Sequence, residues 1–177
     1  VPFDADASFY QDLLLKRDPV GLISIERCGI NSKNDYANMR GVSIRENTAT
    51  IDQLFSLAHK KGLPTWGVGD GGNEIGMGNL KDVISKKLSL VPCVNKVDHL
   101  VIATVSNWGA FGMTAYLEKL TGVHVFPSYE NMHKYLEQTV AIGSIDGVNK
   151  VHVCTVDGYP AEVEEEIVNA LQDSLSN

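Results

Sequence analysis

A glycine-rich run at residues 67–79 constrains this chain more than any other feature. Its sequence is GVGDGGNEIGMGN, and it holds six of the sixteen glycines of the chain, with Asp70, Asn73 and Glu74 between them. Glycine loses more conformational entropy on folding than any other residue, so a cluster of this density needs a local reason. Two reasons are available: a positive φ at several positions, or a ligand that approaches the bare backbone closely.

The segments on either side of this run indicate its place in the fold. Residues 63–68 are apolar and predict a buried strand, whereas residues 80–87 predict a helix that Asn79 caps. A strand, a glycine-rich loop and a helix N-terminus in this order are typical of α/β proteins that bind a small anionic molecule.

The rest of the sequence alternates between strands and helices, which predicts an α/β fold. We expect a mostly parallel sheet with helices on both faces, in a Rossmann-like three-layer αβα arrangement. The length suits a single α/β domain over residues 1–177. Val1 in the place of Met suggests that the true N-terminus is missing, so we also consider that the chain is the C-terminal part of a longer domain. The further strands are expected at 20–25, 99–105 and 123–126, with a strand or an extended piece near 151–156. The helices are expected at 7–16, 51–61, 110–120, 128–140 and 161–175, and a long irregular loop at 30–47.

Charge and composition narrow the class of partner. A net charge of −7 and a pI near 5.1 argue against nucleic acid or an anionic membrane, and no apolar run reaches the length of a membrane span. Three cysteines without a CxxC pair fit a reducing compartment, so we expect the cytoplasm, or the mitochondrial matrix in a eukaryote. The expected partner is a small anionic metabolite, such as an amino acid, and a homo-oligomer is compatible with the sequence.

Polar side chains directly follow three of the predicted strands. In open parallel sheets, ligands bind in the crevice beyond the carboxyl ends of the strands, so these side chains are expected to meet there. The residues are Glu26 and Arg27 after the first strand, Asp70 with Asn73 and Glu74 after the second, and Ser106 and Asn107 after the third.

Each of these groups also has a purely structural interpretation. Glu26 and Arg27 could form a surface ion pair, and Asp70 and Glu74 could cap the turn and the helix that follow. For the whole glycine run we favour function, because capping alone does not require so many glycines. The polar loop at 34–41 is either a mobile surface loop or a lid whose Arg40 binds a carboxylate through two hydrogen bonds.

Two other kinds of site are weakly indicated. The glycines at 67, 69 and 72 match the dinucleotide pattern GxGxxG, but no acidic residue follows about twenty positions later to bind a ribose. No HxxxH or Cys/His cluster indicates zinc. A hard divalent cation on Asp70 and Glu74 is compatible with their oxygen ligands.

The chain resembles the D-glutamate cyclase C-terminal-domain family. The resemblance rests on ERCG at 26–29, DYANMRG at 35–41, the glycine run at 67–79, SNWGAFG at 106–112 and TVDGYP at 155–160, in the order of the family and over almost the whole chain. Members of that family carry a further N-terminal stretch with another glycine- and acid-containing strand end, which this chain does not include.

The resemblance implies the dehydration of D-glutamate to 5-oxo-D-proline. For that reaction we assign catalysis to Glu26, Asp70 and Glu74, with a divalent cation (Mn²⁺ or Mg²⁺) on Asp70 and Glu74 as an alternative way to polarise the γ-carboxylate. Asp70 or Glu74 acts as the general base, Arg27 or Arg40 binds the α-carboxylate, and backbone N–H groups of the glycine run face the oxyanion. The residues assigned to substrate binding are Arg27, Asn38, Arg40, Gly71, Gly72, Asn73, Ser106, Asn107 and Asp157.

Two rival functions remain open at this point. One is a nucleotide- or phosphate-using α/β enzyme that has a similar glycine loop, and the other is a non-catalytic domain that binds an amino acid or another small anion. Preferential binding of nucleotides over glutamate and 5-oxoproline would support the first rival. Binding of an amino acid without any product at high protein concentration would support the second.

Overall fold

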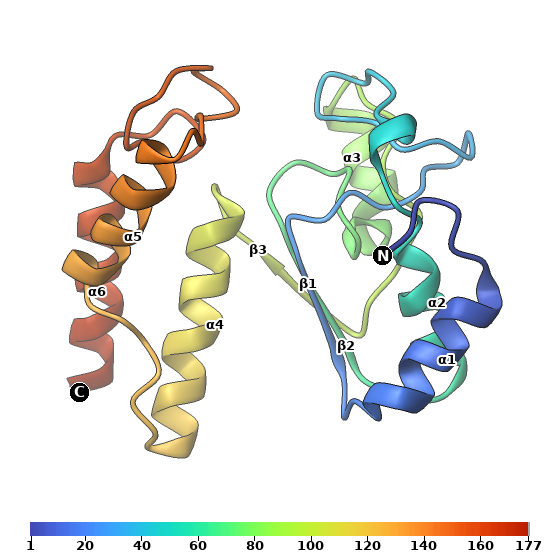
Figure 1. Cartoon of the computed structure of the whole chain (residues 1–177), viewed down its shortest axis with the longest axis horizontal. Helices are drawn as coiled ribbons and strands as arrows, with labels where there is room; N and C mark the ends of the chain where they lie inside the picture. Colours follow the sequence, from blue (N-terminus) through green and yellow to red (C-terminus); the bar gives the residue numbers. More distant parts are fainter. Residues whose placement is uncertain (177) are drawn as a thin grey trace. The chain divides into compact units, whose positions relative to one another are not determined.

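The computed structural model describes residues 1–176 and divides the chain into two compact units, Val1–Ser106 and Asn107–Asn177 (Figure 1). The expectation of one domain over the whole chain remains a prediction, since two compact units can belong to one domain. Among residues 1–176, no helix combines the length and the apolar character that crossing a membrane requires.

The first unit contains a three-stranded parallel sheet in the order β1-β2-β3, which confirms the predicted α/β fold. The strands are β1 (Leu22–Ile25), β2 (Thr65–Gly69) and β3 (His99–Ile102). Ile25 pairs with Val68, and Val68 pairs with Val101, so the three strands end at the same edge of the sheet. All three strands were predicted, and each is shorter than its apolar run.

Two helices pack on one face of this sheet. They are α1 (Ala7–Arg17), which Asp6 caps by accepting from the N–H of Phe9, and α2 (Asp52–Lys60). Tyr10 and Leu14 of α1 pack against α2, and Phe55 of α2 packs against Leu22 and Leu100 of the sheet. These contacts cover one face of the sheet, and helices on the second face remain a prediction.

The segment between β1 and α2 is irregular, as predicted, with one short 3₁₀ helix, η1 (Arg45–Asn47). The buried Tyr36 anchors it by donating a hydrogen bond from its hydroxyl to the carboxylate of Asp52. The glycine run continues into η2 (Met77–Leu80) and α3 (Lys81–Lys87), so the predicted helix begins one residue later than expected.

The second unit is helical. Its helices are α4 (Ser106–Thr121), whose first residue belongs to the first unit, α5 (Tyr129–Ala141) and α6 (Ala161–Ser176). Its core is formed by Ala115, Phe126 and Val168, all buried. Helix α4 begins four residues before the predicted start, so the polar group after β3 forms its first turn.

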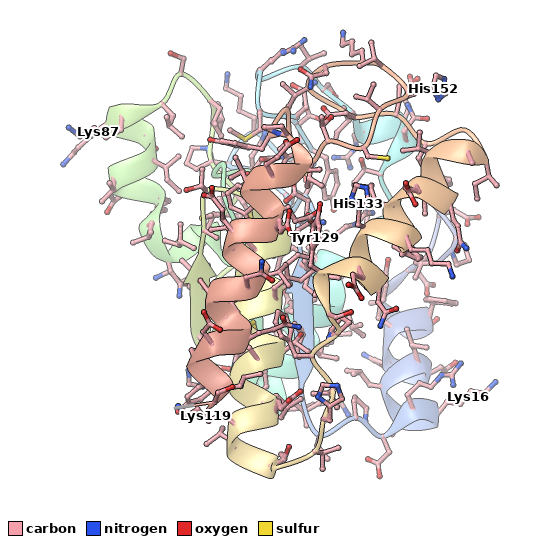
Figure 2. All side chains as sticks on the ribbon, turned by 90° about the vertical axis from the view of Figure 1, so that its left-hand side faces the viewer. Lys16, Lys87, Lys119, Tyr129, His133 and His152 are labelled. Carbon is pink, nitrogen blue, oxygen red and sulfur yellow. The ribbon has the colours of Figure 1, made fainter. Side chains whose placement is uncertain are left out.

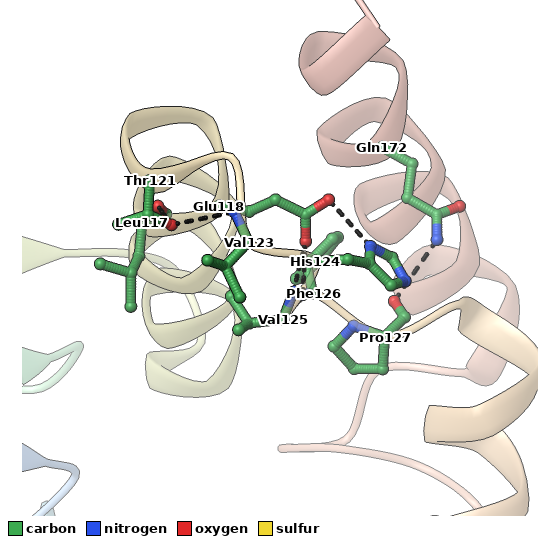
Figure 3. A network of polar contacts seen from close by, with 9 residues as sticks. All are labelled: Leu117, Glu118, Thr121, Val123, His124, Val125, Phe126, Pro127 and Gln172. Carbon is green, nitrogen blue, oxygen red and sulfur yellow. Dashed lines mark hydrogen bonds and ion pairs between the residues drawn. The ribbon is translucent and has the colours of Figure 1, made fainter.

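The strand predicted at residues 123–126 is wrong, because a side chain takes the backbone N–H groups that a sheet would need. The carboxylate of Glu118 accepts hydrogen bonds from the N–H groups of Val125 and Phe126, both at 2.7 Å, and contacts His124 Nδ1 at 2.9 Å (Figure 3). These bonds hold the pKa of Glu118 at about 2, the His124 contact having the largest effect. The segment is therefore a connection fixed by one carboxylate of α4.

Of the strand or extended piece expected near residues 151–156, the structure has no strand, and again a carboxylate sets the conformation. Asp146 accepts from the N–H groups of Val148, Asn149 and Gly158 and from the hydroxyl of Thr155. Among the described residues, only an isolated bridge between Val156 and Tyr159 is present here. A loop organised from within needs no neighbouring strand.

Candidate functional site

The ends of β1 and β2 bring two carboxylates together. Glu26 directly follows β1 and Asp70 directly follows β2, and each offers a carboxylate oxygen within 4.8 Å of the other. The backbone extends the pairing of the strands by one step, since the N–H of Glu26 donates to the carbonyl of Val68 at 3.0 Å. The structure thus brings these two predicted site residues to the edge of the sheet where ligands bind in parallel folds.

Glu26 has a backbone conformation that a non-glycine residue rarely adopts. Its φ is +55°, in the left-handed region, and its side chain is exposed. This conformation costs about 1 kcal/mol for a residue with a Cβ, and such residues cluster at functional sites. The strain marks position 26 as one where the direction of the side chain matters.

Asp70 is fixed by Ser106, the fully buried first residue of α4. Oδ2 of Asp70 accepts from both the N–H and the hydroxyl of Ser106, each at 3.0 Å. The carboxylate therefore lies at the N-terminus of a helix, where the helix dipole favours a negative charge. Oδ1 accepts no hydrogen bond from a described residue, so one oxygen positions the group while the other can face a substrate.

Glu74 has a different environment from the one its predicted catalytic role implies. Its side chain is only 2% exposed and accepts three backbone hydrogen bonds, from Asp70 N at 3.1 Å, Gly71 N at 2.8 Å and Gly72 N at 2.6 Å. Glu74 is thus an internal anion that holds the loop. A role for Glu74 as base or metal ligand, and for the Gly71 and Gly72 N–H groups at an oxyanion, remains a prediction that requires these bonds to open.

The glycines of the run are explained by the packing of the protein against itself. A Cβ on Gly67 would meet the carbonyl of Ile75, and one on Gly78 would meet the carbonyl of Val94. Gly72 and Gly76 have φ values of +114° and +107°. Positive φ, the first of the two reasons considered, therefore applies at two positions, and close approach at others is made by the chain itself instead of by a ligand.

The predicted lid at 34–41 contacts the glycine run. Met39 lies against Gly71, where it would block a Cβ, and Asn73 donates from Nδ2 to the carbonyl of Ala37 at 3.0 Å. Asn38 organises the loop itself, since its Oδ1 accepts from the N–H groups of Arg40 and Val42. The lid interpretation assigned no role to Met39, although Met39 belongs to the predicted lid.

The two candidate arginines differ in availability. Arg27 donates from its guanidinium to the carbonyl of Ala49 at 2.9 Å, so it ties the irregular segment to the end of β1. The Arg40 side chain is exposed and makes no hydrogen bond or ion pair with a described residue. Of the two, Arg40 has the guanidinium with all its donors available for a carboxylate.

Cysteine chemistry is absent from this edge of the sheet. Cys28 is buried and donates weakly to the carbonyl of Ala37 at 3.3 Å, and burial raises the pKa of its thiol. Burial also raises the pKa of the Cys93 thiol to about 12. Neither residue supplies a thiolate near neutral pH, so acid–base chemistry here rests on carboxylates.

Two predicted site residues belong to the second unit. Asn107 is exposed in the first turn of α4, and Asp157 is half-buried in a tight turn with a φ of +50°. Their participation in the site remains a prediction. The structure brings together, within the first unit, Glu26, Asp70, Glu74 and Ser106, with Gly71, Gly72 and Asn73 on the same loop and Asn38 on the loop that contacts it.

These features define an α/β protein with an acidic site at the carboxyl ends of its parallel strands. The chain belongs to the family described as D-glutamate cyclase-like, C-terminal, whose family model matches residues 4–172. It is similar to the human protein named D-glutamate cyclase, mitochondrial, with 38% identity over 112 residues. The match covers 61% of this chain and 18% of the human protein. The family predicted from the five motifs is therefore confirmed.

Proposed function

We propose that this protein is a D-glutamate cyclase-like lyase that converts D-glutamate to 5-oxo-D-proline and water. The observation that carries the proposal is the pair of carboxylates, Glu26 and Asp70, at the ligand-binding edge of the sheet in a chain of this family. The name of the human relative supports the same reaction.

The reaction needs acid–base groups and little else. The α-nitrogen attacks the γ-carboxyl carbon, a C–N bond forms, and a C–O bond of the γ-carboxyl breaks. Starting from the ammonium and the γ-carboxylate, the nitrogen loses two protons and keeps one, and the leaving oxygen gains two to become water. Because the reaction is intramolecular, holding the substrate in a folded conformation lowers much of the barrier.

The residues of the first unit suggest a division of these tasks. Asp70 takes the two protons that the nitrogen loses, one after the other, through Oδ1, while its bonds to Ser106 keep the carboxylate in place. Glu26, within 4.8 Å, receives each proton from Asp70 and delivers it to the leaving oxygen, which departs as water, so both groups return to their starting state. Arg40 binds the α-carboxylate, and Glu74 holds the loop that orients Asp70.

A divalent cation is compatible with this pair of carboxylates. Glu26 and Asp70 would hold it, and it would supply Lewis acidity at the γ-carboxylate. Glu74 fits this task less well than the sequence suggested, because both of its oxygens already accept backbone hydrogen bonds.

The rival with a bound nucleotide is disfavoured by the same loop. Phosphate sites of this type use the free N–H groups of a glycine-rich loop. Here the N–H groups of Gly71 and Gly72 already bind an internal carboxylate. A nucleotide would have to displace Glu74 from its buried position.

The test is to incubate the protein with D-glutamate, with and without Mn²⁺ or Mg²⁺, and to follow 5-oxoproline by NMR. We expect product from D-glutamate, and a loss of about 100-fold or more in Asp70→Asn, as is usual when a general base is removed. The melting temperature should hold, because the carboxamide oxygen can still accept both bonds from Ser106. Asp82→Asn, an exposed change on α3, is the matched control.

Two outcomes would contradict the proposal. Binding of D-glutamate without any product over hours would identify a non-catalytic domain, and stabilisation by nucleotides alone would support the nucleotide rival. Unfolding of Asp70→Asn would show that the residue acts only as a cap. The location remains part of the proposal: the cytoplasm, or the mitochondrial matrix in a eukaryote; the name of the human relative includes the word mitochondrial.

A further inference from the structure

The second unit contains a cavity of about 380 Å³ among its three helices. Its size falls within the range of small-molecule sites, and its lining is mostly apolar with a few polar groups, which is the usual composition of such sites. The lining residues are Asn107 and Phe111 of α4, Asn131, Met132, Tyr135 and Leu136 of α5, Glu164 of α6, and Pro127 and Val156 of the connections.

Glu164 is the unusual member of this lining. It occupies the buried face of α6, on the same helical row as Val168 and Leu171, and only 5% of it is exposed. No residue in the described part of the chain donates a hydrogen bond to its carboxylate. In the sequence, Glu164 is an acidic residue at an apolar position of the helical period.

A carboxylate in this position needs a partner. Burial raises the pKa of Glu164, and the nearby His133 offsets this only in part. An unpaired buried carboxylate is destabilising, and an apolar residue of similar size would fit the core of the unit better. A contribution to the stability of the protein therefore does not account for Glu164. A ligand that donates hydrogen bonds to its carboxylate would account for it.

The charges around the cavity select the kind of ligand. No lysine or arginine is among the lining residues, and Glu162 and Glu165 flank Glu164 on α6. Tyr129 and His133 lie on α5 (Figure 2), and the Tyr129 hydroxyl contacts His133 Nδ1 and the carbonyl of Ala161 at the start of α6, each at 3.2 Å. A cationic group is thus favoured at Glu164, and the lining residues include no lysine or arginine that could bind a carboxylate on the same ligand.

We propose that this cavity binds a small organic amine with an apolar body. The ammonium, which has three donors, bonds to the carboxylate of Glu164 and to the carboxamide oxygens of Asn107 and Asn131. The apolar body packs against Phe111, Met132 and Leu136. An amino acid is a poor fit for this lining, and the test below measures binding instead of turnover, so its failure would leave the proposed function unaffected.

The experiment titrates 2-phenylethylamine into the protein labelled at its methionine methyl groups and follows the Met132 methyl by NMR. Two analogues without the cation, 2-phenylethanol and 3-phenylpropionate, are the ligand controls. We expect a dissociation constant on the order of 1 mM for the amine, as is typical of a ligand of this size. The alcohol should bind about tenfold or more weakly, and the acid should not bind.

The matched variants are Glu164→Gln and Glu165→Gln, neighbours on α6 of which only the first is buried. Glu164→Gln should weaken amine binding about tenfold or more, and Glu165→Gln should leave it unchanged within about twofold. Equal binding to both variants, or equal binding of amine and acid, would overturn the proposal. If Glu164→Gln does not fold, the wild-type protein provides the test. Intermolecular NOEs between the amine and the Met132 methyl would then support the site, and their absence at saturation would refute it.

Discussion

Replacing Glu74 by glutamine tests whether one buried side chain sets the conformation of the glycine run. Glutamine has the same shape, but only one of its two terminal atoms accepts hydrogen bonds. The Nε2 group would face a backbone N–H where Glu74 Oε2 now accepts from Gly72 at 2.6 Å. The carboxamide oxygen could still accept from Asp70 and Gly71, without the charge.

The size of the effect follows from these three bonds. Leaving the N–H of Gly72 buried without an acceptor costs about 2 kcal/mol. The bonds from Asp70 and Gly71 change from charged to neutral acceptors, which removes about 1 kcal/mol each. We therefore expect Glu74→Gln to lower the free energy of unfolding by about 4 kcal/mol, a large fraction of the stability of a typical domain.

The assay is urea denaturation followed by circular dichroism, with Glu46→Gln as the control, since Glu46 is an exposed acid of the same unit. That control should change the free energy of unfolding by less than about 0.5 kcal/mol. Hydrogen exchange of the Gly72 amide gives a local measure and should become much faster in Glu74→Gln. A change equal to that of the control, with the Gly72 amide still protected, would refute the assignment of Glu74 as the organiser of the loop.

Two further predictions address the lid and the second unit. Gly71→Ala places a Cβ against the Met39 side chain and should destabilise the protein by about 1 kcal/mol, with the loss mostly relieved in a Met39→Ala background; a double-mutant cycle in urea measures this coupling, and equal losses in both backgrounds would exclude the contact. Asp146 is buried, which opposes ionisation, but its hydrogen bonds lower its pKa from 3.8 to about 2, so it contributes stability above pH 4 that is lost as the pH falls towards 2. Asp146→Asn should lower the free energy of unfolding by about 1 kcal/mol at pH 7, and its free energy of unfolding should depend less on pH between pH 4 and 2. Acid titration followed by the Gly158 amide signal would detect this difference.

The regular elements were predictable because their signals are local. The helical periods of α1, α2, α5 and α6 and the apolar runs of β1, β2 and β3 depend on neighbouring residues alone, and the structure has each of them within a few residues. The family was predictable for a related reason, since its motifs are contiguous.

The errors share one physical cause. Residues 123–126 have the composition of a strand, but Glu118 binds the N–H groups of Val125 and Phe126 that a sheet would need. Residues 151–156 have a similar composition, but Asp146 fixes the loop around them through the Thr155 hydroxyl and the N–H groups of Val148, Asn149 and Gly158 on either side. Glu74 does the same for the glycine run. In each case a carboxylate bonds to backbone several residues away, and a sequence pattern does not indicate which acid will do so.

The location of the candidate site could be predicted from the sequence, but the roles of its individual residues could not. Two strand ends predicted the meeting of Glu26 and Asp70, because parallel strands end at one edge of the sheet. The glycines indicated an unusual loop, but the sequence could not distinguish approach by a ligand from approach by the chain itself. The same limit applied to Glu164, whose burial depends on the packing of three helices.

The left-handed backbone of Glu26 has a practical consequence for anyone who engineers this protein. Selection for heat tolerance alone favours glycine at position 26, since glycine adopts that geometry without penalty. Such a variant would survive heating better and would lack one carboxylate of the proposed acid–base pair. Mutant libraries selected for heat tolerance should therefore keep Glu26 unchanged, or should be screened for catalytic turnover as well as for thermal stability.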